Sequence, residues 1–216
     1  MATATRSPNP ATPPSPESLV SRPARVQFSV DDYHRLAELG FFHEDARVEL
    51  IEGDLIAMSP IGPRHASEVN RLNALLGSRV AGRAIVTVQN PLHLDEHSEP
   101  EPDLMLVRPR DDFYASAHPG PADVLLLIEV MDSSSAYDRG TKLGLYARSD
   151  VAEVWLIDLI EDRIEMHRIP DKGTYMERLI RSRGQTVAPT ALPDVELDVD
   201  AILGPPEAGP TPPARS

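Results

Sequence analysis

One carboxylate stands inside a segment that otherwise has the character of a buried strand. The segment DVLLLIEV, residues 123–130, carries Glu129 among leucine, isoleucine and valine residues. Such an apolar run is typical of a strand in the middle of a sheet, where an ionised carboxylate must be paired, protonated or bound to a metal. A salt bridge to an arginine or a lysine, or a strand end that reaches solvent, would satisfy Glu129 without any chemistry. A second polar group nearby would favour a functional site.

Asp103 is a second carboxylate that strand pairing would bring to the same place. In EPEPDLMLV, residues 99–107, it follows a proline at the entry to an apolar strand. If this strand pairs antiparallel with residues 123–130, the start of one lies beside the end of the other. Two adjacent carboxylates need a cation, and hard oxygen ligands select Mg²⁺ or Mn²⁺. Glu99 and Glu101 are expected nearer to solvent, as charges around the site.

A lysine follows on the next predicted helix. In SSSAYDRGTKLGLYAR, residues 133–148, Ser135 and Asp138 have the spacing of a capping box, so a helix is predicted over about 138–148 with Lys142 in its first turns. A helix that folds back beside its parent strand would point Lys142 into the pocket of the two carboxylates. The alternative is an exposed pair of Asp138 and Lys142, whose i, i+4 order is favourable on a helix surface.

Two further residues place a polar group on an apolar face. His65 precedes Val69 by about one helical turn, so its side chain should face the sheet. It is either a core histidine whose hydrogen bonds are made within the protein or a residue of the site. Glu49, in VELIEG, has apolar neighbours on both sides, as Glu129 does. Because a hairpin strand can leave one face in solvent, a purely structural role is an equal alternative for Glu49.

An alternating α/β order of elements must position these residues. SVDDYHRLAEL, residues 29–39, predicts a short helix with Ser29 as its N-cap. RVELIEGDLIAM, residues 47–58, predicts a hairpin that turns at Gly53, because glycine can adopt the positive φ of a tight turn. Residues 63–80 have the apolar spacing of a helix with one buried face. Five further strands are predicted at residues 84–94, 103–107, 123–130, 153–158 and 163–169, the last two being internal strands or a dimer edge.

Composition limits the class of protein. Six of the 22 prolines lie in residues 1–25 and five in 203–216, which predicts disordered tails around one domain, residues 26–202. The tails hold four of the 21 basic and two of the 34 acidic residues, so the domain has a net charge of −15. This charge opposes the approach of nucleic acid unless a local basic surface exists.

The absence of cysteine excludes thiol catalysis and disulfides. Without an apolar secretory core or a membrane-length apolar run, a cytoplasmic chain is expected.

The order of elements and residues resembles the Uma2 family of the restriction-endonuclease-like PD-(D/E)xK superfamily. The resemblance covers residues 33–168, and its most specific part is the combination of Glu, Asp-Arg-Gly, Lys and Tyr-Ala-Arg in the third of its segments. The segments that carry it are VELIEGDLIAMSPIGPRHASEVNRLNALL, EPDLMLV and LLIEVMDSSSAYDRGTKLGLYARSDVAEVWLID. The resemblance implies an α/β nuclease core in which a central mixed β-sheet is flanked by helices.

The resemblance also implies roles for the candidate residues. Asp103 matches the Asp of the PD motif and Glu129 the acidic residue of the (D/E)xK motif, and both would bind Mg²⁺ or Mn²⁺. The superfamily lysine normally stands two positions later, where this chain has Met131; Lys142 on the following helix would take over its role. Glu49 and His65 match further family positions that complete or buttress the metal site. MDSSS after Glu129 departs from the usual LSPST, which bears on the geometry of that turn.

Three functions follow as hypotheses. The first is a Mg²⁺-dependent endonuclease that hydrolyses DNA, with a homodimer as a family-level expectation. The second is a nuclease fold that binds or assembles without competent catalysis, favoured by the acidic charge and the displaced lysine. The third is a metal-dependent phosphoesterase acting on a small substrate. Under the first hypothesis, a local patch should contact DNA through some of the arginines Arg64, Arg71, Arg108, Arg110 and Arg139.

Overall fold

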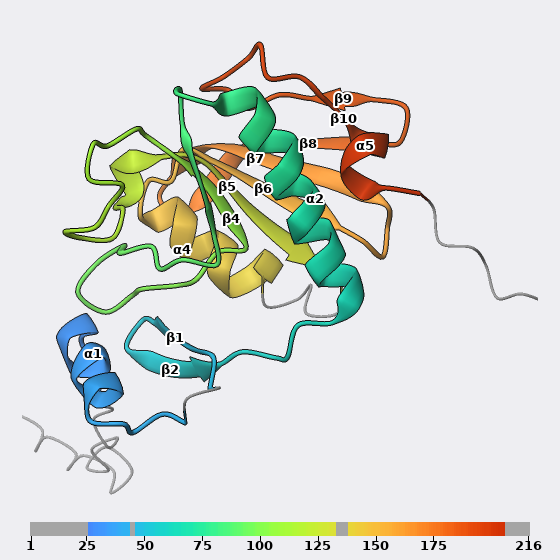
Figure 1. The fold of residues 1–216 in the computed structure, drawn as a ribbon. Helices are drawn as coiled ribbons and strands as arrows, with labels where there is room; N and C mark the ends of the chain where they lie inside the picture. The colour runs from blue at the N-terminus through green and yellow to red at the C-terminus, as the bar shows by residue number, and fades with distance from the viewer. Residues whose placement is uncertain (1–25, 44–45, 133–137, 206–216) are drawn as a thin grey trace, which may run out of the picture.

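A six-stranded mixed sheet forms the centre of the protein (Figure 1). The computed structural model describes residues 26–43, 46–132 and 138–205. The strand order is β3-β4-β5-β6-β7-β8, in which β5 and β6 are parallel and all other neighbours are antiparallel. The strands are β3 (Ile85–Val88), β4 (Leu104–Val107), β5 (Val124–Met131), β6 (Glu153–Asp158), β7 (Arg163–Asp171) and β8 (Thr174–Ser182).

The predicted antiparallel pairing of the two acid-bearing strands is confirmed. In the register of β4 and β5, Leu104 lies opposite Ile128. Asp103 and Glu129 therefore lie side by side at the same end of these two inner strands. β5 is an inner strand between β4 and β6, and its residues from Leu126 to Met131 are buried. The prediction of a central strand that carries a buried carboxylate is therefore confirmed.

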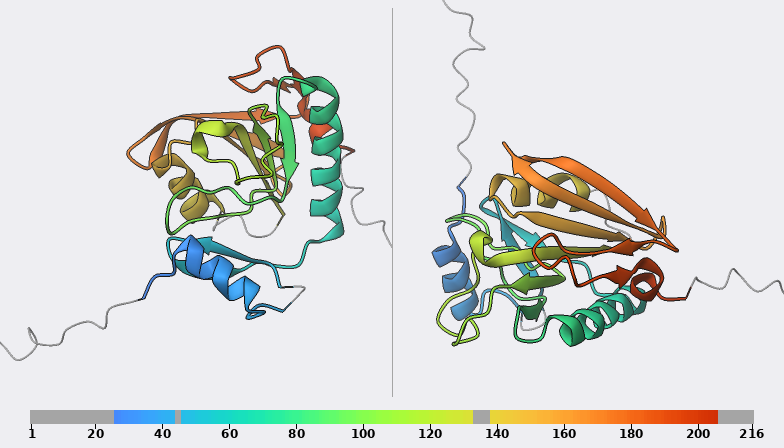
Figure 2. Two further views of the ribbon diagram at one scale, coloured as in Figure 1. Left: turned by 60° about the vertical axis from the view of Figure 1, so that its left-hand side comes forward. Right: turned by 90° about the horizontal axis from the view of Figure 1, so that it is seen from above.

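Helices cover both faces of the sheet, which Figure 2 shows on opposite sides. On one face α2 (Pro63–Val80) packs Leu72 and Leu76 against a core that includes Trp155, and α5 (Val199–Leu203) lies beside α2. On the other face Tyr146 packs with Leu127, Leu156 and their neighbours. That face is covered by the one-turn π-helix η3 (Asp138–Lys142) and the short helix α4 (Leu143–Arg148). α2 begins and ends as the sequence predicts, with Pro63 in its first turn.

The hairpin and the first helix form a separate layer at one end of the sheet (Figure 1). β1 (Val48–Ile51) pairs antiparallel with β2 (Asp54–Ala57), and Glu52 and Gly53 both have positive φ at the turn, as a tight hairpin of this kind requires. α1 (Val30–Glu38) has the predicted N-cap Ser29, whose side chain and that of Asp32 also form a capping box. The sequence predictions for both elements are confirmed.

Several elements differ from the sequence prediction. The strand predicted over 84–94 ends at Val88, because Gln89 has φ 51° and turns the chain out of the sheet. β8 was not predicted because its residues alternate between exposed and half-buried positions instead of forming an apolar run. As a result β7 is an internal strand and β8 forms the edge. Four short elements were also missed, namely η2 (Pro121–Asp123), β9 (Thr186–Val187), β10 (Leu197–Asp198) and α5.

The domain continues slightly beyond the predicted boundary at residue 202. Leu203 ends α5 and is buried, so it belongs to the core and not to a tail. The predicted tail at 1–25 and residues 206–216 of the tail predicted at 203–216 lie outside the described residues, as does the capping serine Ser135. The helix predicted over 138–148 is divided into η3 and α4. Among the described residues, no helix combines the length and the apolar character needed to cross a membrane.

Candidate active site

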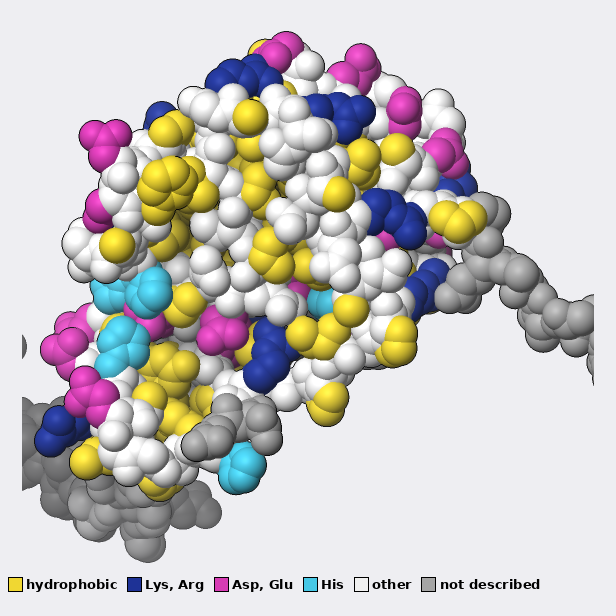
Figure 3. Space-filling view, in the orientation of Figure 1, with side chains coloured by type: hydrophobic (Ala, Val, Ile, Leu, Met, Phe, Trp, Pro, Cys, Tyr) yellow, Lys and Arg dark blue, Asp and Glu magenta, His cyan; other side chains and the backbone are white. Residues whose placement is uncertain are grey.

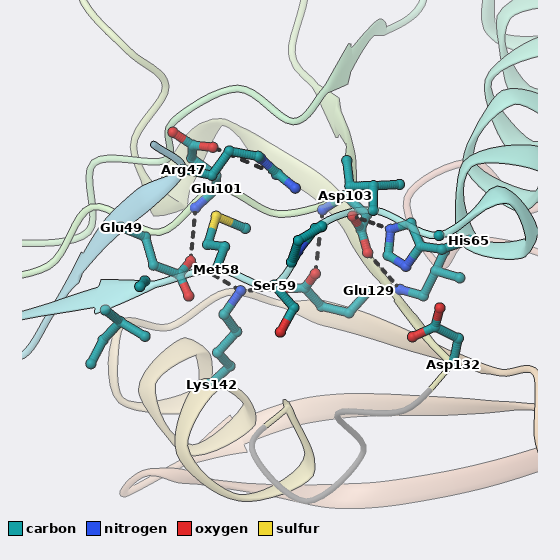
Figure 4. Close-up of a pocket in the computed structure, with 16 residues that line it drawn as sticks. Arg47, Glu49, Met58, Ser59, His65, Glu101, Asp103, Glu129, Asp132 and Lys142 are labelled. Carbon is teal, nitrogen blue, oxygen red and sulfur yellow. Dashed lines mark hydrogen bonds and ion pairs between the residues drawn. The ribbon is translucent and has the colours of Figure 1, made fainter. Parts of the chain in front are cut away.

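A cavity of about 460 Å³ opens between the β1–β2 hairpin and the edge of the main sheet. Its wall includes residues 56–62, which run from β2 to the start of α2. Figure 3 shows acidic, basic and histidine side chains together in the seam between the hairpin layer and the body of the protein. All five residues singled out in the sequence line this cavity: Glu49, His65, Asp103, Glu129 and Lys142 (Figure 4).

Asp103 is held in place by three donors. Its Oδ2 accepts a hydrogen bond of 2.9 Å from the backbone amide of Val130, on the neighbouring strand. Its Oδ1 accepts from Nε2 of His65 at 2.8 Å and from the side-chain amide of Gln89 at 3.3 Å. The hydrogen bond to Asp103 raises the pKa of His65 above its ordinary value, although partial burial acts in the opposite direction. His65 therefore faces the sheet as predicted, and it binds the first carboxylate.

Glu129 is 3% exposed, and its charge is met by groups of the protein itself. Oε2 accepts a hydrogen bond of 3.3 Å from the backbone amide of Asp103. Oε1 accepts from the hydroxyl of Tyr146 at 2.6 Å and lies 3.5 Å from Nζ of Lys142. Two donors on the helical segment after β5 thus compensate the buried carboxylate.

Lys142 joins the hairpin layer to the sheet. Its Nζ lies 3.0 Å from Oε2 of Glu49, and both side chains are almost completely buried. The same Glu49 oxygen accepts a hydrogen bond of 3.3 Å from the backbone amide of Glu101. Lys142 thus stands between two carboxylates, Glu49 from β1 and Glu129 from β5 (Figure 4). The alternative of an exposed pair with Asp138 does not describe the buried Lys142.

Three polar residues of the site were missed in the sequence. Tyr146 contacts Glu129 directly. The sequence could have indicated this residue by its position four residues after Lys142, because residues at i and i+4 lie on one side of a helix. Asp132 lines the cavity just past the end of β5. Gln89 reaches Asp103 only because the chain turns at its positive φ. No sequence pattern indicates the contact of Gln89.

The prediction for Glu99 was wrong. Glu99 is 2% exposed and lies away from the cavity, where its Oε1 is 2.6 Å from Nε2 of His34 and its Oε2 is 3.3 Å from Nδ1 of His93. His34 is 65 residues away in the sequence, and no local pattern indicates that it or the nearer His93 contacts Glu99. Glu101 does line the cavity, where burial raises its pKa and Arg47 lies 3.8 Å away.

The five arginines, some of which were expected to form a DNA-binding patch, lie on several elements of the structure. Arg108 and Arg110 follow the end of β4 that is remote from Asp103. Arg139 binds Oε1 of Glu165 at 2.9 Å and also contacts the buried Asp158. Arg64 and Arg71 lie on α2 and line a second pocket together with Arg183. Arg64 and Arg71 therefore remain together and gain Arg183 as a neighbour, and Arg64 and Arg139 contact the adjacent residues Leu159 and Asp158.

The donor set of the cavity fits a hard divalent cation. Within the described residues, no three His, Asp or Glu side chains are arranged to hold a metal ion among themselves. Mg²⁺ in nucleases and polymerases is commonly held by one or two carboxylates, while waters and substrate phosphates complete the octahedron. Asp103 and Glu129 meet that smaller requirement, because both are carboxylates at the same edge of an open cavity.

The mixed sheet flanked by helices is the core expected from the resemblance to restriction-endonuclease-like proteins. The chain belongs to the Uma2 family, whose model is described as "Putative restriction endonuclease" and matches residues 30–200. A comparison with curated proteins found no match.

A crystal structure among the solved structures that match this chain has a similar fold. It is the crystal structure, at 1.96 Å resolution, of "a putative nuclease belonging to DUF820" from Anabaena variabilis ATCC 29413. The TM-score is 0.63 at 16% sequence identity, and the match covers 82% of this chain and 97% of that chain. At this identity the likeness shows the fold alone.

Proposed function

We propose that the protein is a divalent-metal-dependent endonuclease that hydrolyses DNA phosphodiester bonds with water as the nucleophile. The observation that carries the proposal is the juxtaposition of Asp103 and Glu129, with Lys142 beside them, in an open cavity of about 460 Å³. Membership of a family described as a putative restriction endonuclease supports it.

The two carboxylates form the metal-binding part of the proposed site. Asp103 and Glu129 hold Mg²⁺ or Mn²⁺, which when bound supplies a Lewis acid for the phosphodiester and lowers the pKa of a bound water. His65 fixes the orientation of Asp103 through its hydrogen bond, and Tyr146 does the same for Glu129. Both orienting residues keep the carboxylate oxygens in place before substrate enters.

Lys142 is the cationic part of the proposed site. Its ammonium group donates hydrogen bonds and cannot accept a proton, so it orients the attacking water and stabilises negative charge on the phosphoryl oxygens. Hydrolysis forms a bond between the water oxygen and phosphorus and breaks one ester bond. The water gives up one proton to solvent, and the oxygen that leaves takes up one proton from solvent. Glu49 holds Lys142 from the hairpin side, 3.0 Å from its Nζ. We therefore assign Glu49 a positioning role.

A second candidate is a nuclease fold that binds its partner without cleaving it. The observation that favours it is that Lys142, Tyr146 and a backbone amide already compensate Glu129 within the protein. The fold consequently needs no metal to bury this charge. In this case the cavity would bind a partner, and the metal ligands would have no catalytic consequence.

The test uses purified protein with MgCl₂, MnCl₂ or EDTA, incubated with supercoiled and single-stranded DNA. Asp103→Asn and Glu129→Gln keep the size of each side chain but remove its charge. Asp111→Asn, at an exposed position, serves as the control. A further arm with bis(p-nitrophenyl) phosphate detects a phosphodiesterase of small substrates.

Nicking that needs the metal, is lost in both site variants and is unchanged in the control would support the endonuclease. Hydrolysis of the small ester without any attack on DNA would favour the phosphoesterase instead. If the wild type cleaves neither substrate and calorimetry detects no Mg²⁺ or Mn²⁺ binding, the endonuclease proposal is wrong and the binding module takes its place.

A further inference from the structure

A second, smaller pocket of about 150 Å³ lies where α2 meets the end of α5 and the turn between β6 and β7. Three residues of α2 at positions i, i+4 and i+7 line it, namely Arg64, Glu68 and Arg71. Asp162 of the turn and Arg183, which follows β8, complete its charged wall. Figure 3 shows basic side chains gathered on the side where the first half of α2 faces α5. In a chain with a net charge of −13, three arginines around one small pocket form a local basic site.

Two of these arginines are anchored by the protein. Arg183 makes two hydrogen bonds to Asp162, at 2.6 and 3.0 Å, and a third of 2.7 Å to the carbonyl oxygen of Gly204. Arg64 donates from Nη2 to the carbonyl oxygen of Leu159 at 2.5 Å. These bonds hold the two guanidinium groups in the wall before any ligand arrives, which reduces the entropy lost on binding.

Arg71 differs from them. Its Nη1 is buried and has no hydrogen-bond partner among the described residues. The guanidinium group lies against Gly204, where an added Cβ atom would fall only 1.2 Å from Nη1. A glycine is therefore required at that position for Arg71 to occupy the pocket wall. A buried guanidinium nitrogen without an acceptor is unfavourable unless a ligand supplies one.

Glu68 is the second unsatisfied group of the pocket. It is 3% exposed, and its Oε1 has no hydrogen-bond partner among the described residues. Burial raises the pKa of Glu68 to about 7. The positive charges of Arg71, Arg183 and Arg64 act to lower this pKa, whereas the negative charge of Asp162 acts to raise it. Near neutral pH the carboxyl group is thus close to half protonated, and the protonated form can donate a hydrogen bond. Asp200 of α5 is not part of the pocket wall, and its Oδ1 lies 3.4 Å from Nη1 of Arg183.

We propose that this pocket is a phosphate-binding site, with Arg71 as the principal donor and with Arg64 and Arg183 in support. Guanidinium groups match the geometry of phosphate oxygens and bind them by charge-assisted hydrogen bonds. The ligand supplies the acceptor that Nη1 of Arg71 lacks. A protonated Glu68 donates to a second phosphate oxygen, and the remaining charges of the wall favour an anion.

The position of the pocket indicates where the phosphate comes from. α2 carries His65 in the catalytic cavity and Glu68 and Arg71 in this pocket, about 5 and 9 Å farther along the helix axis at 1.5 Å per residue. Phosphates of one strand are spaced by about 3.4 Å along a DNA helix, so the two sites can hold phosphates of the same strand a few nucleotides apart. This assignment to DNA rests on the proposed function, whereas phosphate binding itself does not.

The first experiment measures sulfate binding by calorimetry between pH 6 and pH 8.5, because sulfate keeps its double charge over this range. The variants are Arg71→Met and Glu68→Gln, and Arg79→Met on an exposed part of the same helix is the matched control. We expect affinity to fall at least tenfold in Arg71→Met and to be unchanged in the control. Wild-type affinity should weaken as Glu68 ionises above pH 7, and Glu68→Gln should remove most of this pH dependence.

The second experiment identifies the source of the phosphate. Fluorescence anisotropy compares a single-stranded oligonucleotide with and without a 5′-phosphate, and inorganic phosphate is the competitor. Equal losses of affinity for both oligonucleotides in Arg71→Met would indicate an internal phosphodiester, whereas a loss confined to the phosphorylated one would indicate a strand end. A loss of sulfate and phosphate binding alone would indicate a free phosphate or a small phosphorylated molecule.

Failure of this proposal is distinguishable from failure of the proposed function. Sulfate that binds Arg71→Met and Glu68→Gln as it binds the wild type, or does not bind the wild type at all, would overturn the phosphate site even if DNA is cleaved. Sulfate binding that depends on Arg71 in a protein that cleaves nothing would support the phosphate site and contradict only the endonuclease. If Arg71→Met fails to fold, the pH profile of Glu68→Gln decides the question.

Discussion

The hydroxyl group of Tyr146 donates a hydrogen bond of 2.6 Å to Oε1 of Glu129 in the interior of the protein. Lys142, four residues earlier, lies 3.5 Å from the same oxygen. One helical segment therefore supplies both the neutral and the charged donor for the buried carboxylate. The orientation of Glu129 depends on how this segment packs, which leads to the first two predictions.

Replacement of Tyr146 by phenylalanine should lower both stability and activity. A hydrogen bond to a charged group contributes about 1.5–3 kcal/mol, so the free energy of unfolding should fall by roughly 2 kcal/mol in urea titrations followed by the fluorescence of Trp155, the single tryptophan. Because Glu129 loses its orientation, half-maximal cleavage should need more Mg²⁺. Tyr175→Phe loses a hydrogen bond to the carbonyl oxygen of Val151 and should leave the Mg²⁺ requirement unchanged. An unchanged requirement in Tyr146→Phe would show that its role is structural only.

Replacement of Lys142 by methionine should leave Glu49 and Glu129 buried without their shared cation. Removing one partner from a buried ion pair lowers the free energy of unfolding by about 3–5 kcal/mol. Mn²⁺ should recover more stability in this variant than in the wild type, because a metal ion can compensate the same carboxylates. The control is Lys172→Met, which changes the other lysine of the chain, an exposed residue. Equal thermal stabilities of Lys142→Met and the wild type would contradict the prediction.

Glu165 should give the protein a stability that depends on pH. It is 1% exposed and binds Arg178, Arg139 and Arg163 at 2.8, 2.9 and 3.0 Å. Burial alone would raise the pKa of Glu165, but the hydrogen bonds from Arg178 and Arg139 outweigh it and lower the pKa. A lowered pKa in the folded state stabilises the protein above the unfolded value of about 4.3, and this contribution is lost as pH falls through the folded value.

Glu165→Gln tests this dependence. The variant should lose about 3 kcal/mol of unfolding free energy at pH 7, because several arginines are left without their buried partner. The difference from the wild type should shrink as pH falls below the unfolded value of about 4.3 and continue to shrink until pH passes the lowered folded pKa, where the carboxylate of the folded wild type becomes protonated. Urea titrations from pH 3 to pH 8 measure it. Glu177→Gln, at a half-buried position of the same sheet, should show little effect at any pH, because its contact with Arg168 is long, at 3.8 Å. A constant difference across the pH range would argue against the ionised network.

Gly53→Ala should loosen the hairpin that carries Glu49. Gly53 has φ +80°, and a Cβ atom there would lie 2.5 Å from Cβ of Gln27, so both the backbone and the packing oppose any side chain. We expect a loss of roughly 2 kcal/mol in unfolding free energy and lower cleavage, because the hairpin holds one wall of the cavity. Gly77→Ala, in an open position of α2, should instead raise stability by up to about 1 kcal/mol. A neutral result for Gly53→Ala would contradict this account of the turn.

The main elements could be predicted because their signals are local. α2 follows from its apolar spacing and Pro63, and the β1–β2 hairpin from two apolar runs around Gly53. β8 escaped prediction because edge strands alternate between exposed and half-buried residues and lack an apolar run. The shortened β3 escaped because a non-glycine residue, Gln89, adopts a positive φ that its type does not announce.

The candidate site divides in the same way. Asp103 and Glu129 could be placed together from the sequence, since antiparallel pairing of adjacent strands brings the start of one beside the end of the other. The burial of Glu129 within an apolar segment was likewise visible in the sequence. That Lys142 joins Glu49 to Glu129, or that Tyr146 contacts Glu129, depends on how the hairpin and helix layers pack.

The sequence by itself determined the order of the elements, the pairing of the two acidic strands and the five polar residues that line the cavity. Only the tertiary structure decided that Glu99 is buried between two histidines and that Arg64, Arg71 and Arg183 share one pocket. The physical reason is that hydrophobic periodicity and turn residues act over a few neighbouring positions. Contacts between polar side chains that are distant in sequence are set by the packing of layers, which no local pattern specifies.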